Sequence, residues 1–245
     1  MEPAWEAAGW ERLAPRVGRV RLPHWDCTAG LVVGDEAALM VEAGSSLAEG
    51  AALRTRAREL IGGGRRVTHL ALTHPHFDHV FGAAAFAGVQ VYAAVGIGTV
   101  LTAGREELRA EAVRHGLGAD AAAEAADLLR APRHPVSGEW TLDLGGGVEV
   151  LLANVGPGHT AHDLAVLAHG PGDAPEVVFC GDLVEESGEP QAGPDAVPER
   201  WPAALDRLLA LGGADAVYVP GHGAVVDAAF VRAQRATLAA RFGVS

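Results

Sequence analysis

Three histidines and an aspartate lie within six residues of this chain, in the segment His74-Pro75-His76-Phe77-Asp78-His79. Imidazole nitrogens and carboxylate oxygens are the ligands that zinc and similar divalent metals prefer. His74 and His76 are two residues apart, so on an extended backbone both side chains point to the same side. Asp78 and His79 follow at the turn and can face a second ion nearby. The segment therefore predicts ligands for two metal ions, which together turn a bound water into a nucleophile near neutral pH.

Three further predicted strand ends carry a metal-ligand residue next to glycine. They are Gly156-Pro157-Gly158-His159, Gly181-Asp182 and Pro220-Gly221-His222-Gly223. Glycine allows the backbone to pack closely where ligands converge. Each turn by itself is typical of an ordinary loop with one polar residue. Together with the histidine segment, they indicate one site built from loops at the ends of strands.

Strands and helices are mixed through the whole chain, which predicts an α/β protein. Strands are expected over 17–22, 29–35, 37–41, 67–72, 89–93, 140–152 (two strands), 164–168, 177–180 and 216–219. Helices are expected over 47–60, 80–87, most of 98–129, 198–211 and 225–242. No linker-like stretch divides the chain, so we expect a single domain over residues 1–245. Segment 185–198, rich in glycine, proline and acids, is expected to be an active-site loop.

The composition restricts the class of function. The chain has 245 residues, 49% of them hydrophobic, a net charge of −12 and no lysine. Nucleic-acid binding needs clustered basic residues, so we expect no nucleic-acid partner and instead a small-molecule substrate. Neither a signal peptide nor an apolar run long enough for a membrane span is apparent, so a cytoplasmic protein without membrane contact is expected. The sequence gives no indication of the oligomeric state.

The two cysteines, Cys27 and Cys180, are too far apart and too few to form a disulfide framework. Cys180 ends an apolar run and is interpreted as a small buried residue. Cys27 lies near an expected loop beside the site. A metal-binding or redox role for Cys27 therefore stays open at this point.

The order and spacing of the ligand motifs resemble those of the metallo-β-lactamase superfamily, from about Val17 to the C-terminal helix. The resemblance implies a four-layer αββα sandwich with the site at one edge of its two sheets. It also implies two zinc ions, with iron or manganese as alternatives. The implied ligands are His74, His76 and His159 for one metal, Asp78, His79 and His222 for the other, and Asp182 as a bridge between them.

Differences from the usual family pattern indicate which subgroup of the family the chain resembles. Glu42 occupies the turn where the family often has an aspartate that supports the ligand loop, and its longer side chain should still do so. Antibiotic-hydrolysing members with a Gly-Pro-Gly-His-Thr motif place a cysteine at the position of Asp182 and a lysine shortly after it. This chain has no lysine to bind the carboxylate of such a drug, although an arginine could substitute. The chain is most similar to glyoxalase II-like hydrolases that carry Gly-Asp-Leu-Val and Val-Pro-Gly-His-Gly.

These features lead us to expect a dinuclear zinc hydrolase, in which metal-bound hydroxide attacks an ester, thioester, lactone or amide carbonyl. Asp78 is the expected catalytic residue, because it can orient the hydroxide or pass on its proton. One alternative is a mononuclear iron enzyme similar to persulfide dioxygenases, which needs only His74, His159 and Asp182. Another is a non-catalytic metal-binding module of a biosynthetic pathway.

Several residues beyond the ligands are candidates for the surroundings of the site. His162 and Asp163 follow His159 and are candidates to support it, although for His162 a surface position is an equal expectation. The substrate-binding residues are not identified by the sequence. Candidates for the substrate wall are His24, Trp25, Trp140, Trp201 and segment 185–198, although core packing is the more common role for any one of these aromatic residues.

Overall fold

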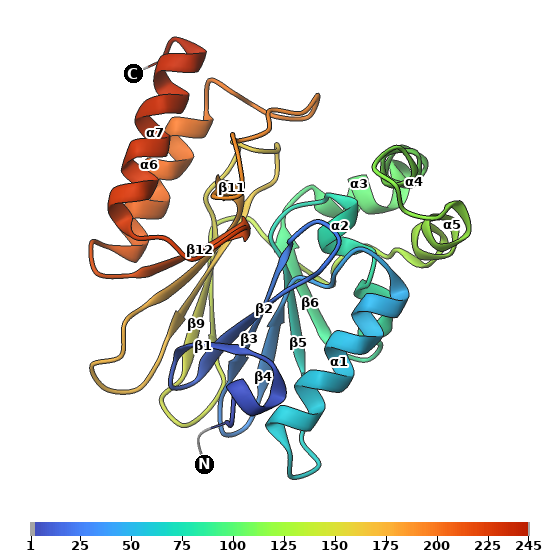
Figure 1. The fold of residues 1–245 in the computed structure, drawn as a ribbon, viewed down its shortest axis with the longest axis vertical. Helices are drawn as coiled ribbons and strands as arrows, with labels where there is room; N and C mark the ends of the chain where they lie inside the picture. Colours follow the sequence, from blue (N-terminus) through green and yellow to red (C-terminus); the bar gives the residue numbers. More distant parts are fainter. Residues whose placement is uncertain (1–2, 245) are drawn as a thin grey trace.

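The computed structural model describes residues 3–244. Two β-sheets pack face to face, and helices cover their outer faces, which confirms the expected αββα sandwich (Figure 1). Helix α1 lies along the outer face of the first sheet, whereas α6 and α7 lie side by side against the second (Figure 1). Within the described chain, no helix is both long and apolar enough to cross a membrane.

The first sheet has seven strands in sequence order. Its first four strands are antiparallel, and the pairs β4–β5, β5–β6 and β6–β7 are parallel. The parallel part carries the histidine segment directly after β5. The strands are β1 Glu11–Ala14, β2 Val17–Arg21, β3 Thr28–Val33, β4 Ala38–Val41, β5 His69–Leu72, β6 Gln90–Ala94 and β7 His134–Val136.

The second sheet has five strands in the order β12-β11-β10-β9-β8. The pair β11–β12 is parallel and the others are antiparallel. Parallel pairing brings the ends of β11 and β12 to the same sheet edge, and both carry a predicted ligand. The strands are β8 Glu139–Asp143, β9 Glu149–Asn154, β10 Leu164–His169, β11 Val177–Glu185 and β12 Val217–His222.

The long helices begin with local caps. The side chain of Ser46 accepts a hydrogen bond from the backbone N–H of Glu49, and Asp227 accepts one from Phe230 in the same way. Such caps satisfy backbone donors that have no partner inside the helix. The helices are α1 Leu47–Ile61, α2 Phe77–Val80, α3 Ile97–Ala103, α4 Arg105–Arg114, α5 Ala119–Leu128, α6 Trp201–Gly212 and α7 Ala228–Phe242, with 3-10 turns η1 Glu6–Ala8 and η2 Ala83–Phe86.

The second sheet is apolar on both faces because it lies between two layers. In β10, Leu164 and Val166 pack into the core between the sheets, whereas Ala165 and Leu167 pack toward α6 and α7. Successive side chains of a strand point to opposite faces, so a strand covered on both sides is apolar throughout. This explains why the apolar runs of the sequence predicted these strands.

The structure differs from the sequence prediction in several local elements. Strands β1 and β7 were not expected, and both are short edge strands. The expected helix over 80–87 is instead the short helix α2 followed by η2, and the segment 98–129 forms three helices. Strand β11 continues past the expected end at residue 180, so Asp182 lies within the strand rather than after it.

Candidate metal centre

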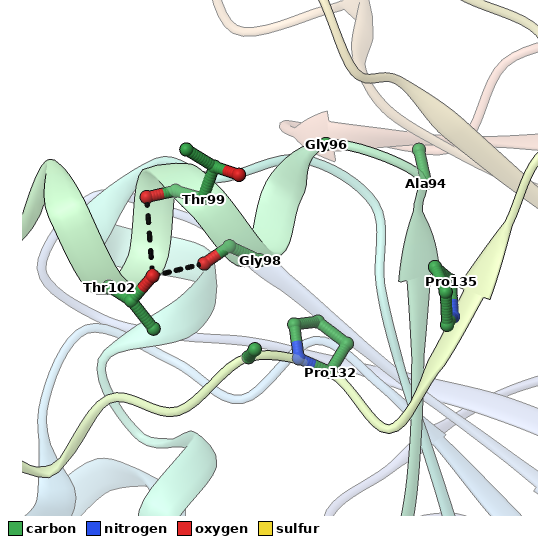
Figure 2. A pocket seen from close by; sticks show the side chains of 8 residues that line it. Ala94, Gly96, Gly98, Thr99, Thr102, Pro132 and Pro135 are labelled. Carbon is green, nitrogen blue, oxygen red and sulfur yellow. Dashed lines mark hydrogen bonds between the residues drawn. The ribbon is translucent and has the colours of Figure 1, made fainter.

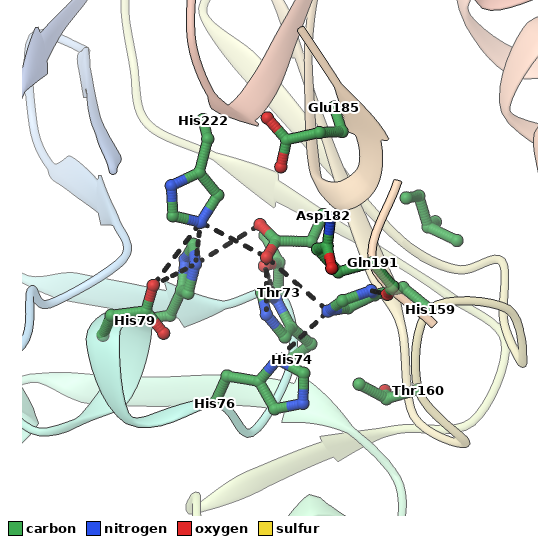
Figure 3. A network of polar contacts seen from close by, with 12 residues as sticks. Thr73, His74, His76, His79, His159, Thr160, Asp182, Glu185, Gln191 and His222 are labelled. Atoms are coloured by element: carbon green, nitrogen blue, oxygen red, sulfur yellow. Dashed lines mark hydrogen bonds and ion pairs between the residues drawn. The ribbon is translucent and has the colours of Figure 1, made fainter. Parts of the chain in front are cut away.

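The histidine segment follows β5 and enters the short helix α2, so the chain turns sharply with all its ligand side chains held inward (Figure 3). His74 and His79 are essentially inaccessible to solvent. Polar side chains are rarely buried to this degree unless they have a partner. The burial therefore indicates that these residues face a site rather than the surface.

The first of two ligand clusters consists of His74, His76, His159 and Asp182, whose ligand atoms all lie within 4.8 Å of one another. The Nδ1 atom of His76 lies 3.0 Å from Nε2 of His159. The Oδ2 atom of Asp182 lies 3.6 Å from Nε2 of His74 and 3.5 Å from Nε2 of His159. The structure thus brings together four predicted residues from three separate segments, two of them loops and the third strand β11.

The second cluster consists of Cys27, Asp78, His79 and His222, within the same 4.8 Å limit. The Nε2 atom of His222 lies 3.4 Å from Nε2 of His79 and 3.4 Å from Oδ2 of Asp78. The cluster contains the three residues that the sequence predicted. It also contains a cysteine whose role the sequence had left open.

Asp182 lies between the clusters. Its Oδ1 is 3.3 Å from Nε2 of His79, and its Oδ2 is 3.3 Å from Nε2 of His222, in addition to its contacts with the first cluster. The flanking glycines make this close approach possible. A Cβ atom at Gly221 would lie 1.8 Å from Oδ1 of Asp182, and one at Gly181 would lie 2.4 Å from Oγ1 of Thr73. Any side chain at either position would displace the shared carboxylate or the histidine segment.

Thr73 and Glu42 contact the Nδ1 side of the two most buried histidines, His74 and His79, and leave the Nε2 side to the site. Thr73 donates its hydroxyl hydrogen to Glu42, so its oxygen can accept from Nδ1 of His74 at 2.8 Å. Nδ1 of His79 lies 3.5 Å from Oε1 of Glu42. This arrangement directs Nε2 of both rings into the site, which is how metal-binding histidines are usually held. Glu42 thus occupies the supporting position that the sequence predicted.

The outer three histidines follow the same pattern. Nδ1 of His222 lies 2.6 Å from the carbonyl oxygen of Trp25, and Nδ1 of His159 lies 3.2 Å from that of Gln191. Nε2 of His76 lies 3.0 Å from Oδ2 of Asp195. Each ring therefore has an acceptor for its outer nitrogen and presents the other nitrogen to the clusters. Asp195 was not predicted as an individual residue, because nothing in its local sequence marks it.

The ligand atoms that have no hydrogen-bond partner are of the types that bind a cation. Nε2 of His74, Nδ1 of His79 and Oδ1 of Asp182 are buried without a hydrogen-bond partner among residues 3–244, although Nδ1 of His79 faces Glu42. Buried polar atoms without partners are rare and costly, and a bound ion is one way to satisfy them. Imidazole nitrogen and carboxylate oxygen are also the donor types that zinc binds. The residues present therefore fit a metal centre.

The proton affinities of the histidines differ between the clusters. Burial lowers the pKa of His74 well below its usual value and lowers the pKa of His159 to about 4. Burial alone would also lower the pKa of His79 and His222, but the Asp182 carboxylate next to them raises both well above the usual value. Without a metal, protons on these two rings neutralise the carboxylates. A metal ion would take over that role and displace the protons.

Residues beyond the clusters fall into different roles. Trp25 is partly buried and packs edge to face on Phe77, with ring centroids 5.2 Å apart. Trp201 is completely buried behind His159, so it supports the ring rather than facing a substrate. Trp140 packs on Tyr92 and His134, at β7 and β8, the edge strands of the two sheets. It is therefore also not part of a substrate wall.

The two residues expected to support His159 also differ. Asp163 is buried and accepts hydrogen bonds from the backbone N–H and the hydroxyl of Thr160, which fixes the turn that carries His159. Burial raises the pKa of Asp163 to about 7. His162 is partly exposed and its ring packs on Gly96, so it does not contact the ligands.

A hollow of about 390 Å³ lies elsewhere, beside β6, β7 and α3 (Figure 2). Its lining consists of glycine, alanine, threonine and proline residues, and the hydroxyl of Thr102 is hydrogen-bonded to the carbonyl oxygen of Gly98. None of the lining residues carries a titratable side chain or belongs to the clusters. This hollow therefore offers no groups for catalysis.

Three solved structures are similar to this chain in fold. FIM-1 from Pseudomonas aeruginosa in its mono-zinc form is similar at 17% identity, with 95% of each chain covered and a TM-score of 0.67. TMB-1 is similar at 19% identity, with 95% of this chain and 97% of that chain covered and a TM-score of 0.68. DIM-1 exposed to ceftazidime is similar at 17% identity, with coverages of 95% and 96% and a TM-score of 0.67. At these identities, the likeness concerns the fold alone.

Two further comparisons concern the sequence. No curated protein matches the chain. The family described as the metallo-beta-lactamase superfamily matches residues 22–222, a range that contains both ligand clusters. The chain therefore belongs to the metallo-beta-lactamase superfamily.

Proposed function

We propose that this protein is a hydrolase that uses two zinc ions to cleave an ester, thioester, lactone or amide bond. The observation that carries the proposal is the pair of adjacent ligand clusters that share Asp182. A site for one ion would need no second group of buried ligands around Asp78, His79 and His222. The superfamily also contains members that are not hydrolases, so the reaction rests on the site and not on the family.

In this proposal His74, His76 and His159 hold one zinc ion, and Asp78, His79 and His222 hold the other, with Asp182 between them. When bound, two such ions supply a Lewis acid for the carbonyl oxygen and ionise a water near neutral pH. The protein contributes the fixed positions of the ligands. Its buried surroundings also strengthen electrostatic interactions with the charge that develops during the reaction.

Asp78 is the proposed group for proton transfer. Its Oδ2 faces His79 at 3.6 Å and His222 at 3.4 Å, which leaves its other oxygen available to hold the proton of the attacking water. The side chain is buried, so this oxygen would not be saturated by solvent. A carboxylate within hydrogen-bond reach of the reacting water can act as a general base.

The substrate is proposed to lie against the segment 185–198, which contacts two histidines of the first cluster. Gln191 and Asp195 of this segment contact His159 and His76, so a substrate bound at the first cluster would also touch the segment. The similar structures include enzymes named as metallo-beta-lactamases, but this chain has no lysine to bind a drug carboxylate. We therefore favour esters, thioesters and lactones over β-lactams.

The proposal is tested by measuring the metal content of the purified protein together with hydrolysis of a thioester, a lactone and a chromogenic cephalosporin. We expect about two zinc ions per chain. Turnover should be lost on chelation and restored by added zinc, and the best substrate identifies the branch. One iron ion per chain without hydrolysis would contradict the proposal and favour the dioxygenase alternative. A chain without metal would indicate a binding module.

A further inference from the structure

Cys27 contacts the second ligand cluster from a segment that carries none of the predicted ligands. It directly precedes β3 and pairs with His222 through an isolated β-bridge. Only 2% of its surface is exposed. The first sheet thereby contributes a sulfur atom to a cluster whose other ligands come from α2 and β12.

The sulfur atom lies at a distance from the second cluster that suits a metal ligand. Ligand atoms at zinc-bonding distances of 2.0–2.3 Å are about 3.3–3.8 Å apart in a tetrahedral site. The three pairs among Asp78, His79 and His222 are 3.4, 3.4 and 3.6 Å apart. Sγ of Cys27 lies 3.1 Å from Oδ2 of Asp78 and 3.9 Å from Nε2 of His222, which brackets the tetrahedral range.

The other cysteine shows how a merely structural thiol is placed in this protein. Cys180 packs among apolar side chains between the second sheet and its helices, and its Sγ donates to the carbonyl oxygen of Val178. Cys27 instead faces a carboxylate and two imidazoles, which are metal-ligand groups. Thiolate is itself a strong zinc ligand. The two residues are equally buried, so burial alone does not explain the polar surroundings of Cys27.

We propose that Sγ of Cys27 is a further protein ligand of the metal held by Asp78, His79 and His222, in addition to the shared Asp182, an inference that rests on the proposed metal centre. On binding, the thiol loses its proton to solvent and the sulfur forms a bond to the metal. With the shared Asp182 counted as well, this metal would have no open position, unlike the metal of a catalytic zinc site. An incoming substrate would then bind at the cluster of His74, His76 and His159.

The test uses cobalt(II) in place of zinc, added stepwise to protein from which metal has been removed by a chelator. A cobalt ion bound to thiolate gives a charge-transfer absorption in the near ultraviolet that imidazole and carboxylate ligands do not give. We expect this band in the unsubstituted protein and in the control Cys180→Ala, and its loss in Cys27→Ser. The number of cobalt ions bound is measured in the same titration, and circular dichroism checks that the variants fold.

X-ray absorption at the zinc edge of the unsubstituted protein gives a second readout that needs no variant. A sulfur neighbour at about 2.3 Å is expected. If two cobalt ions bind but no thiolate band and no sulfur neighbour appear, the inference about Cys27 is wrong while the proposed metal centre stands. A band that persists in Cys27→Ser would also overturn it. If no metal binds, both proposals fail together.

Discussion

The two ligand clusters share one carboxylate but differ in charge and in origin. The first contains three histidines and only the shared Asp182, and the pKa of two of its rings, His74 and His159, is lowered by burial. The second adds Asp78 and a thiol, and the pKa of His79 and His222 is raised, against the effect of burial, by nearby carboxylates. In the first cluster only His76, whose pKa is raised by Asp195 against the effect of burial, must release a proton, whereas in the second cluster both rings must do so.

This difference in histidine pKa values indicates how a shared site can bind two ions with different affinities. Neutral imidazoles bind a metal without competition from protons, so their affinity changes little with pH. Protonated imidazoles close to carboxylates are already electrostatically satisfied, and a metal must replace those interactions. We therefore expect the second position to be the more sensitive to pH and to changes in its supporting residues.

The largest effect should follow from removal of the carboxylate that joins the clusters. Asp182→Ala should lower kcat/KM for the best substrate roughly a thousandfold, since the loss of a metal-held charge costs several kcal/mol in the transition state. Metal content should fall at both positions. The control is Asp206→Ala, which removes an exposed carboxylate paired with Arg235 on the surface and should change neither quantity. An unchanged metal content in Asp182→Ala would contradict the shared role.

Acidification should separate the two positions. Because His79 and His222 have a raised pKa in the metal-free protein, two protons compete with the second metal, and its affinity should fall as pH decreases. Two protons displaced from the rings correspond to a change of about a hundredfold per pH unit, and release of the Cys27 proton would add about a further tenfold. In the first cluster His74 and His159 are already neutral and only His76 has a raised pKa, so one proton competes and its affinity should fall less. Competition with a chelator between about pH 8 and pH 6 measures the affinity of each position. Loss of both ions over the same pH range would contradict the expected difference.

The carboxylate behind the histidine segment should have an intermediate effect. Glu42→Gln weakens the acceptor for Thr73 and removes the negative charge next to His79. Metal affinity should fall about tenfold to a hundredfold, as is typical when a partner of a metal-binding histidine is lost. The second position should be affected more, since Glu42 lies next to His79 itself but reaches His74 only through Thr73. Glu49→Gln, which removes charge at the cap of α1, is a matched control, and an equal loss there would indicate a general effect on folding.

The smallest effect is expected at the edge of the site. Asp195→Asn removes the charge that faces Nε2 of His76 at 3.0 Å, but the side chain of Asp195 is 47% exposed. Exposed ion pairs contribute about 1 kcal/mol or less, so affinity at the first position should fall at most about fivefold. Isothermal titration with zinc at fixed pH provides the measurement. A loss larger than that of Glu42→Gln would show that the segment 185–198 is part of the metal centre itself.

Much of the site was predictable because its ligands lie in short motifs. His74, His76, Asp78 and His79 lie in one turn, and the glycines beside His159, Asp182 and His222 marked the other loops. The structure brings all of these together, although their roles as ligands stay predictions. The aromatic candidates were harder, because an aromatic residue has the same local signature in a core as in a substrate wall. Trp140 and Trp201 belong to packing, for which the sequence offered no distinction.

The sequence by itself determined the types of ligand, their order and the strands that carry them, since hydrophobic periodicity and glycine turns are local properties. Only the tertiary structure decided which other residues join the site. Cys27 reaches the second cluster because the residue directly before β3 pairs with His222 of the other sheet, and Asp195 reaches His76 because the segment 185–198 folds back over the first cluster. Such contacts depend on packing between parts distant in the chain. No local pattern encodes them.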